Sequence, residues 1–173
     1  MAGDDVTPEL LAEVSTLAHA PRVIGVYRRA DLPRGVRPVR LALWRVADPG
    51  NVGTLLRSAA AFGAGVALSA GCADPTGPKA LRASAGAIFR VPVGRFEDAP
   101  RPWIGLVAHE GDPLHELELG DSATFVLGAE RDGLPADVLA RCEARATIPL
   151  APRSESLTVA AAGAIALHEA RRR

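Results

Sequence analysis

Three distant segments of this 173-residue chain place glycine, proline and small polar residues after an apolar run and before a helical pattern. They are DPGNVGTLLRSAAAFG at 48–63, FVLGAERDGLP at 125–135 and IPLAPRSESLTVAAAGAIALHEA at 148–170. In an open α/β sheet, ligands bind in the crevice beyond the carboxyl ends of the strands. Three such junctions therefore predict a single site built from loops that are distant in sequence.

The pattern of apolar residues predicts alternating strands and helices. Expected strands are 22–28, 39–44, 65–70, 88–93, 103–109, 124–128 and 146–150. Expected helices are 8–19, 51–62, 78–86 (a short helix or turn) and 156–170. Strands that alternate with helices are typical of the α/β class, so we expect a mostly parallel sheet with helices on both faces.

Composition limits the class of protein. Hydrophobic residues make up 48% of the chain and charged residues 23%, which is typical of a globular protein. No uninterrupted apolar run reaches the length of a membrane span. The start MAGDDVTPELL carries acids where a signal peptide carries basic residues, so we expect a cytoplasmic protein.

The net charge is zero, yet arginine is concentrated in one stretch, 22–57, which contains only two acids, Asp31 and Asp48. Its arginines are Arg22, Arg28, Arg29, Arg34, Arg37, Arg40, Arg45 and Arg57. Guanidinium groups suit phosphate recognition, and a local basic patch can bind RNA without a basic isoelectric point. A solvated charged surface would have the same composition, so charge alone leaves both interpretations open.

Each segment has a functional and a structural interpretation. In the first, Asn51 is suited to cap the following helix, with Asp48 as the alternative. Backbone N–H groups at that helix start favour an anion, and Arg57 lies within two turns of Asn51. The same pattern is also an ordinary strand-to-helix turn.

The second segment contains two glycines, Gly128 and Gly133, which would let a ligand approach the backbone closely. It is not a Walker loop, and the chain contains no GxGxxG pattern. Glu130 is either a site residue or part of a cap or surface ion pair. In the third segment, the hydroxyls of 154–158 either cap the last helix or face a ligand in the same crevice.

Together the three segments resemble the SpoU/TrmH class of SPOUT RNA 2′-O-ribose methyltransferases. The resemblance covers residue 39 to the C-terminus, with a looser match at 6–29. The first motif, DPxNxGxxxRxAxxFG, is matched by Asp48, Pro49, Asn51, Gly53, Arg57, Ala59, Phe62 and Gly63. The second, GxExxGL, is matched by Gly128, Glu130, Gly133 and Leu134. The third, IPM…SLNVxxA, is matched by Ile148, Pro149, Ser156, Leu157 and Val159.

The resemblance implies a SPOUT-like fold with a C-terminal trefoil knot, in which 39–173 is the catalytic domain and 1–38 an N-terminal, connector-like extension. It implies S-adenosylmethionine as cofactor, with the loops 127–133 and 148–157 as walls of its site. Cofactor-binding residues are then Leu127, Gly128, Gly133, Ile148, Leu150, Leu157 and Thr158. Catalytic residues are Arg57, Asn51, Glu130 and Ser156, and RNA contacts are Arg57, Arg45 and Arg82.

The implied reaction moves a methyl group to a ribose 2′-hydroxyl of tRNA or rRNA, with rRNA slightly preferred, and needs no metal. The implied partners are RNA and a second copy of the chain in a homodimer, without a membrane. The homodimer interface is expected to include the last helix and part of the 51–62 helix.

The sequence departs from the third motif at one position, where the usual Asn is Thr158. This loses an amide with both donor and acceptor capacity. Thr158 therefore leaves open a non-catalytic RNA-binding or assembly protein that retains the fold. A methyltransferase acting on a small molecule or a protein is a third alternative.

Overall fold

The structure is a computed structural model that describes residues 6–15, 19 and 23–172. It forms two compact units, Met1–Leu32 and Pro33–Arg173. The boundary expected between residues 38 and 39 is that of the catalytic domain, which is a different property from compactness, and it stays a prediction.

In the first unit, helix α1 (Pro8–Val14) begins at Thr7, whose Oγ1 accepts a hydrogen bond from the Leu10 N–H at 3.4 Å. The helix expected over 8–19 therefore ends at Val14, and positions 16–18 lie outside the described residues. The strand expected over 22–28 is wrong for residues 23–28, which are irregular apart from one bridge residue, Ile24. A 3₁₀ turn (Arg29–Asp31) follows.

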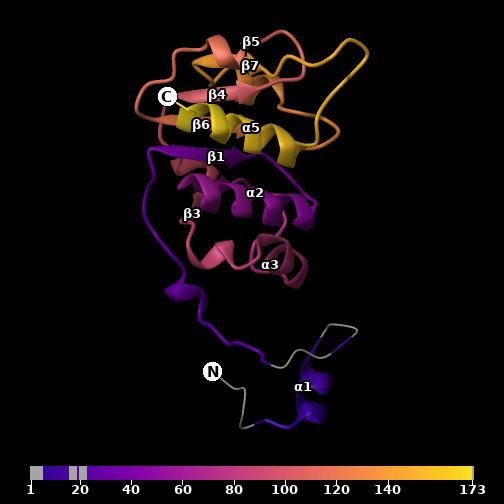
Figure 1. Ribbon diagram of the computed structural model, residues 1–173. Coiled ribbons are helices and arrows are strands. Elements are labelled where there is room, and N and C mark those ends of the chain that lie inside the picture. The colour runs from indigo at the N-terminus through magenta and orange to yellow at the C-terminus, as the bar shows by residue number, and fades with distance from the viewer. Residues whose placement is uncertain (1–5, 16–18, 20–22, 173) are drawn as a thin grey trace. The chain divides into compact units, whose positions relative to one another are not determined.

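The second unit contains a seven-stranded sheet in the order β3-β2-β1-β6-β4-β7-β5, and every neighbouring pair of strands is parallel (Figure 1). The strands are β1 (Val39–Leu43), β2 (Gly65–Leu68), β3 (Val93–Arg95), β4 (Trp103–Leu106), β5 (Asp112–Pro113), β6 (Ala123–Leu127) and β7 (Ala144–Thr147). Strands β1 to β3 extend the sheet in one direction, and the chain then crosses to the other side of β1. The order of strands thus reverses between β1 and β6, which is where ligands bind in open α/β sheets.

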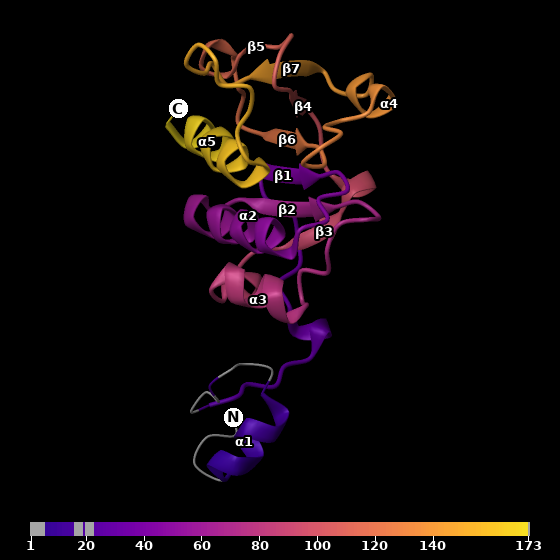
Figure 2. The same ribbon diagram turned by 90° about the vertical axis from the view of Figure 1, so that its right-hand side faces the viewer.

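The helices cover both faces of the sheet, as expected. Figure 2 shows α2 (Pro49–Phe62), α3 (Pro78–Ser84) and α5 (Val159–Arg172) on one side and the short α4 (Ala136–Leu139) on the other. This confirms the α/β class with a parallel sheet. The trefoil knot implied by the resemblance stays a prediction.

The face that carries α2 and α5 depends on small residues. A Cβ at Gly53 would lie 2.5 Å from the Ala80 carbonyl oxygen of α3. A Cβ at Gly163 of α5 would lie 2.4 Å from Leu55 Cδ2 of α2. These contacts bring α2 close to both neighbouring helices and fix the position of its N-terminus.

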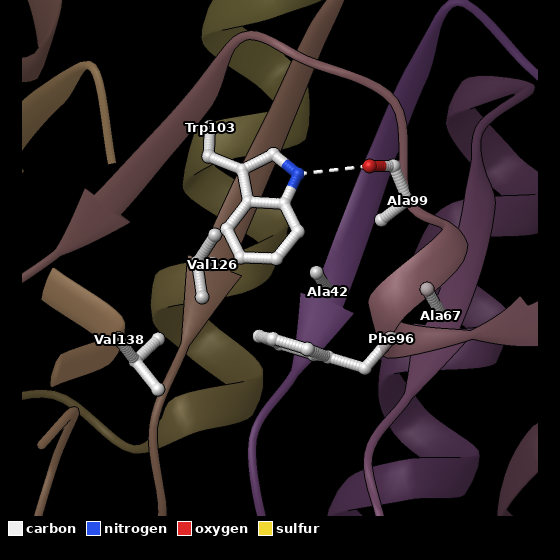
Figure 3. Close-up of a cluster of buried hydrophobic side chains, with 7 residues drawn as sticks. All are labelled: Ala42, Ala67, Phe96, Ala99, Trp103, Val126 and Val138. Atoms are coloured by element: carbon white, nitrogen blue, oxygen red, sulfur yellow. Dashed lines mark hydrogen bonds between the residues drawn. The ribbon is translucent and has the colours of Figure 1, made fainter. Parts of the chain in front are cut away.

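The opposite face is closed by an aromatic cluster (Figure 3). Phe96 packs against Trp103 with ring centroids 5.0 Å apart, and the Trp103 Nε1–H donates to the Ala99 carbonyl oxygen at 2.9 Å. Val126 of β6 and Val138 of α4 complete the contact between strand and helix. This side of the sheet is therefore covered mainly by loops, the short α4 and the 3₁₀ turn Phe96–Asp98.

One predicted strand lies elsewhere. Residues 88–93 were expected to be extended, but Ala87–Phe89 form a 3₁₀ turn and β3 begins only at Val93. Ile88 and Val91, three positions apart, are both buried, so the apolar residues of this segment pack a turn against the core. No helix in the described part of the chain is long and apolar enough to cross a membrane.

Candidate cofactor and substrate site

A cavity of about 540 Å³ lies at the carboxyl ends of β4, β6 and β7. Its walls come from the two loops predicted to hold a cofactor, from the N-terminus of α2 and from the start of α5. All seven predicted cofactor residues line it: Leu127, Gly128, Gly133, Ile148, Leu150, Leu157 and Thr158. The structure thus brings together the residues that the sequence placed at one site. That they bind a cofactor stays a prediction.

The second motif forms a tight loop at the end of β6. Ala129 and Gly133 form an isolated antiparallel bridge, with the Gly133 N–H donating to the Ala129 carbonyl at 2.9 Å. A Cβ at Gly128 would lie 2.1 Å from the Gly133 carbonyl carbon, closer than any side chain allows. Gly133 has a φ of +64°, in the left-handed region. Both glycines are therefore needed for the loop to fold against the cavity.

The third motif follows β7, which ends at Thr147, so Ile148 and Leu150 lie beyond the sheet and face the cavity. The last helix was expected from about residue 156, but α5 begins at Val159. Thr158 precedes it, and its Oγ1 accepts a hydrogen bond from the Ala161 N–H at 3.3 Å. Thr158 thus caps α5, as the structural interpretation of this motif predicted.

The first motif meets the second through one hydrogen bond. The Asn51 side-chain amide donates to Glu130 Oε1 at 2.9 Å, across 79 positions of sequence. The expectation that Asn51 caps α2 is wrong, because Asp48 Oδ1 accepts from the Asn51 N–H at 2.8 Å and performs that role. The Asn51 amide is therefore available to Glu130.

Asp48 is held as a carboxylate. The hydrogen bond from the Asn51 N–H and the Lys79 ammonium 3.3 Å away both lower the pKa of Asp48, and partial burial opposes them. Pro49, at the first turn of α2, has no N–H that would need a hydrogen-bond acceptor, and Asp48 accepts from the Asn51 N–H.

The cavity has few polar side chains. Glu130 is the one carboxylate and Arg131 the one cation among its lining residues, and Ser156 adds a hydroxyl. Three predicted catalytic residues, Asn51, Glu130 and Ser156, thus lie together. The roles assigned to them stay predictions.

The predicted RNA-contacting arginines lie outside this cavity. Arg57 is exposed on α2 and makes no hydrogen bond or ion pair with the residues that the structure describes. Arg82 is exposed on α3, and Arg45 lines a second cavity beyond β1. Arg40 is 5% exposed, so it does not contribute to an exposed basic patch.

Sequence reasoning missed the wall supplied by β4. Leu106, Val107 and Ala108 line the cavity at the end of this strand. The strand was predicted, but its pairing with β6 and β7 depends on the sheet order. The signal available was the apolar run WIGLVA at 103–108, which ends in the small residue Ala108.

Among the described residues, no group of His, Cys, Asp or Glu side chains is arranged to hold a metal ion. The apolar walls, the single carboxylate and the backbone groups of two glycine-containing loops suit an organic ligand. Cavities that bind such ligands are usually about 300–1,000 Å³ in volume, and this one falls in that range.

Known proteins share this arrangement. A tRNA/rRNA methyltransferase of Synechocystis sp., itself uncharacterised, aligns with 96% of the chain and is 35% identical to it over the aligned region. An rRNA methyltransferase from Sinorhizobium meliloti, solved with bound AdoMet, matches 81% of the chain with a TM-score of 0.73 and 32% identity. An RNA 2′-O ribose methyltransferase matches 96% of the chain and 70% of its own length, with a TM-score of 0.74 and 25% identity.

The chain spans 66% of the length of the Synechocystis protein and 57% of the S. meliloti chain. The model of the SpoU rRNA methylase family matches residues 38–168, which include all three motifs and every residue that lines the cavity. The chain belongs to the SpoU rRNA methylase family.

Proposed function

We propose that this protein is an S-adenosylmethionine-dependent methyltransferase that modifies a ribose 2′-hydroxyl of tRNA or rRNA, rRNA being slightly preferred. The observation that carries the proposal is the cavity itself, since three motifs converge on it and Asn51 joins two of them. Family membership, the AdoMet-bound S. meliloti neighbour and the 2′-O ribose methyltransferase neighbour support it.

The cavity suits S-adenosylmethionine. Leu127, Ile148 and Leu157 offer apolar contacts, and the tight loop at Gly128 exposes backbone groups for hydrogen bonds. Bound here, S-adenosylmethionine supplies an electrophilic methyl group attached to a sulfonium. Catalysis then requires that the chain align a ribose hydroxyl with that methyl group, so positioning contributes much of the rate.

Glu130 is the carboxylate that we place next to the reacting hydroxyl. The Asn51 amide holds one of its oxygens at 2.9 Å and so fixes its orientation. A carboxylate in this position takes up the hydroxyl proton as the oxygen attacks. Ser156 lines the same cavity, and its hydroxyl is available to bind the ribose.

Arg57 acts differently, because a guanidinium is effectively never deprotonated in proteins. It lies on α2, outside the cofactor cavity and without a described partner. We assign it to the phosphate next to the target ribose and to the negative charge that develops on the attacking oxygen.

Thr158 was the feature that favoured a non-catalytic RNA-binding protein. In the structure its hydroxyl caps α5. Thr and Asn are both good N-cap residues, so the substitution preserves this local role. The catalytic alternative is therefore preferred over the non-catalytic one.

We further propose a cytoplasmic homodimer that pairs α5 and α2 with their copies. Ile165 of α5 is 36% exposed, and His168 packs edge-on against Phe62 of α2 with ring centroids 6.1 Å apart. The expected interface would cover Ile165 and this contact between the two helices. Light scattering tests this, since a monomer has a mass of 18.0 kDa and a dimer twice that value.

The activity is tested with methyl-labelled cofactor and separate tRNA and rRNA fractions, followed by digestion to nucleosides and mass spectrometry. The proposal predicts label in 2′-O-methylnucleosides. Label on a base would contradict the ribose assignment. Label that survives ribonuclease treatment would indicate a protein or small-molecule substrate, and cofactor binding without transfer would indicate the non-catalytic alternative.

A further inference from the structure

A second cavity, of about 650 Å³, lies beside the first. The two share one wall, formed by Ala129, Glu130, Arg131 and Gly133 of the tight loop after β6. The second cavity opens beyond the carboxyl end of β1, where Trp44 and Arg45 line it. Glu130 therefore separates two spaces, of which the proposed function uses only one.

Trp44 gives the second cavity an aromatic wall that is held in place. Its ring packs edge-on against Phe96, with centroids 5.2 Å apart and an interplanar angle of 63°. Its backbone N–H donates to the Leu127 carbonyl at 2.8 Å. The side chain is only half-buried, so part of the indole is available to a ligand.

Arg45 is fixed at the rim by its backbone. Its φ of +53° is unusual for a residue other than glycine, and its N–H donates to Ser69 Oγ at 2.9 Å. Its side chain lies over Gly71, where a Cβ would be 3.4 Å from Arg45 Nε. The Arg45 guanidinium makes no hydrogen bond or ion pair with the described residues, so it is available to an anion.

The charges around this cavity are mixed. Arg45 and Arg131 are opposed by the carboxylates of Glu130, Asp132 and Asp137. Three carboxylates would repel a run of phosphates, but they can accept hydrogen bonds from the amino groups of a nucleobase. An aromatic surface, carboxylate acceptors and a cation at the rim match one nucleotide, with its base inside and its phosphate outside.

We propose that the second cavity receives the base of the target nucleotide, stacked against Trp44, with Arg45 contacting its phosphate. This inference rests on the proposed function, because the ribose of that nucleotide would then lie at the shared Glu130 wall, facing the cofactor cavity. Sequence-specific RNA recognition commonly uses unstacked bases placed against aromatic side chains. Trp44 is thus a substrate-positioning residue.

The two tryptophans of the chain make a direct test possible. Trp103 is 2% exposed in the core, so the Trp103→Phe variant leaves Trp44 as the only reporter. We expect Trp44 emission to be quenched by a mixed-sequence 12-nucleotide single-stranded RNA and by millimolar CMP or AMP, with S-adenosylhomocysteine present. The matched Trp44→Phe variant, in which only Trp103 emits, should show no quenching.

Absence of quenching in Trp103→Phe with all of these probes would overturn the inference. If that variant fails to fold, the wild-type protein serves instead, because its Trp44 component should be quenched and its buried Trp103 component should not.

Methyl transfer gives an independent measurement. Base stacking on an aromatic ring contributes enough that Trp44→Leu should raise the KM for RNA about 10-fold or more. Trp44→Phe, which keeps a ring, should rescue most of this loss, and both variants should bind S-adenosylmethionine as the wild type does. Equal KM values for Trp44→Leu and wild type would overturn the inference and leave the proposed function intact. Quenching without any methyl transfer would overturn the proposed function and leave the nucleotide cavity intact.

Discussion

At the amino ends of β4 and β7 each charged side chain of one cluster contacts either an opposite charge or an aromatic ring, whereas at the carboxyl ends of the strands several have no such contact. Glu143 accepts hydrogen bonds from the Trp103 N–H at 2.6 Å and from Arg101 Nη1 at 2.7 Å. Arg101 also donates to the Arg141 carbonyl, and both guanidinium groups lie over the Trp103 ring, 4.8 and 4.6 Å from its centroid. Glu143 and Arg101 of this amino-end cluster thus form an ion pair, and Arg141 lies against the Trp103 ring.

The carboxyl ends differ. Arg45 and Arg131 line the second cavity there, and Arg57 lies on the helix that follows β1; the guanidinium groups of all three make no hydrogen bond or ion pair with the described residues. The Glu130 carboxylate accepts one hydrogen bond, from the Asn51 side-chain amide. The two regions have similar residue types, so composition does not distinguish them. What distinguishes them is whether the chain itself provides the partner, which separates charges that stabilise the fold from charges left for a ligand.

The largest effect should come from closing the space between Gly128 and Gly133. In Gly128→Ala the new Cβ meets backbone atoms 2.1–2.4 Å away, which cannot rotate aside. We expect calorimetry to detect no binding of S-adenosylmethionine, with a loss of unfolding free energy of about 1–3 kcal/mol. The control is Gly94→Ala, because a Cβ at Gly94 meets nothing within 4 Å. Normal binding by Gly128→Ala would show that this loop is not a cofactor wall.

The next effect should separate activity from cofactor binding. Arg57→Ala should lower kcat for methyl transfer about 100-fold or more, the scale of losing one group that stabilises developing charge. Affinity for S-adenosylmethionine should stay within about twofold, because Arg57 does not line the cavity. Arg145→Ala, which removes another exposed arginine from a strand distant from Arg57 in sequence, is the control. Equal losses of binding and transfer would instead indicate a structural role for Arg57.

Much of this arrangement could be predicted because the signals are local. Apolar runs bounded by glycine or proline identified β1, β2, β4 and β6 to within a few residues. The motifs following the strands then identified the cavity, since the carboxyl ends of parallel strands share one edge.

The errors arose where local signals left alternatives open. Asp48 and Asn51 are both good caps; Asp48 takes this role, and the Asn51 amide instead binds Glu130, 79 positions away. Strand β5 and helix α4 were not predicted, because two and four residues are too few to show a period. The second cavity was also missed, because Trp44 alone gives no indication of which loop will lie opposite it.

At the amino ends of β4 and β7, we expect a change of Glu143 to alter the free energy of unfolding in a way that depends on pH. Partial burial raises the pKa of Glu143, but the hydrogen bonds from Trp103 and Arg101 outweigh it and leave that pKa below its ordinary value. Glu143 therefore stabilises the fold above the unfolded-state pKa of about 4.3, and this contribution is lost as pH falls through the lower folded-state pKa.

Glu143→Gln should accordingly lower the free energy of unfolding at pH 7 by about 1 kcal/mol, a value reduced for solvent exposure. Urea titrations at neutral and acidic pH should show the gap between variant and wild type narrowing as pH falls. Cofactor affinity should not change. A gap that does not depend on pH would mean that the geometry of this side chain matters more than its charge.

The smallest effect should come from Arg141, whose guanidinium lies over Trp103 but carries no ion pair with the described residues. Arg141→Met keeps a long apolar side chain over the ring and removes the charge, so the loss of unfolding free energy should be about 0.5–1 kcal/mol. Arg101→Met should cost more, because Arg101 also binds Glu143. If Arg141→Met were the more destabilising of the two, the stacked cation would contribute more than the ion pair. The amino-end cluster would then be held together mainly by the indole ring of Trp103, with Glu143 in a secondary role.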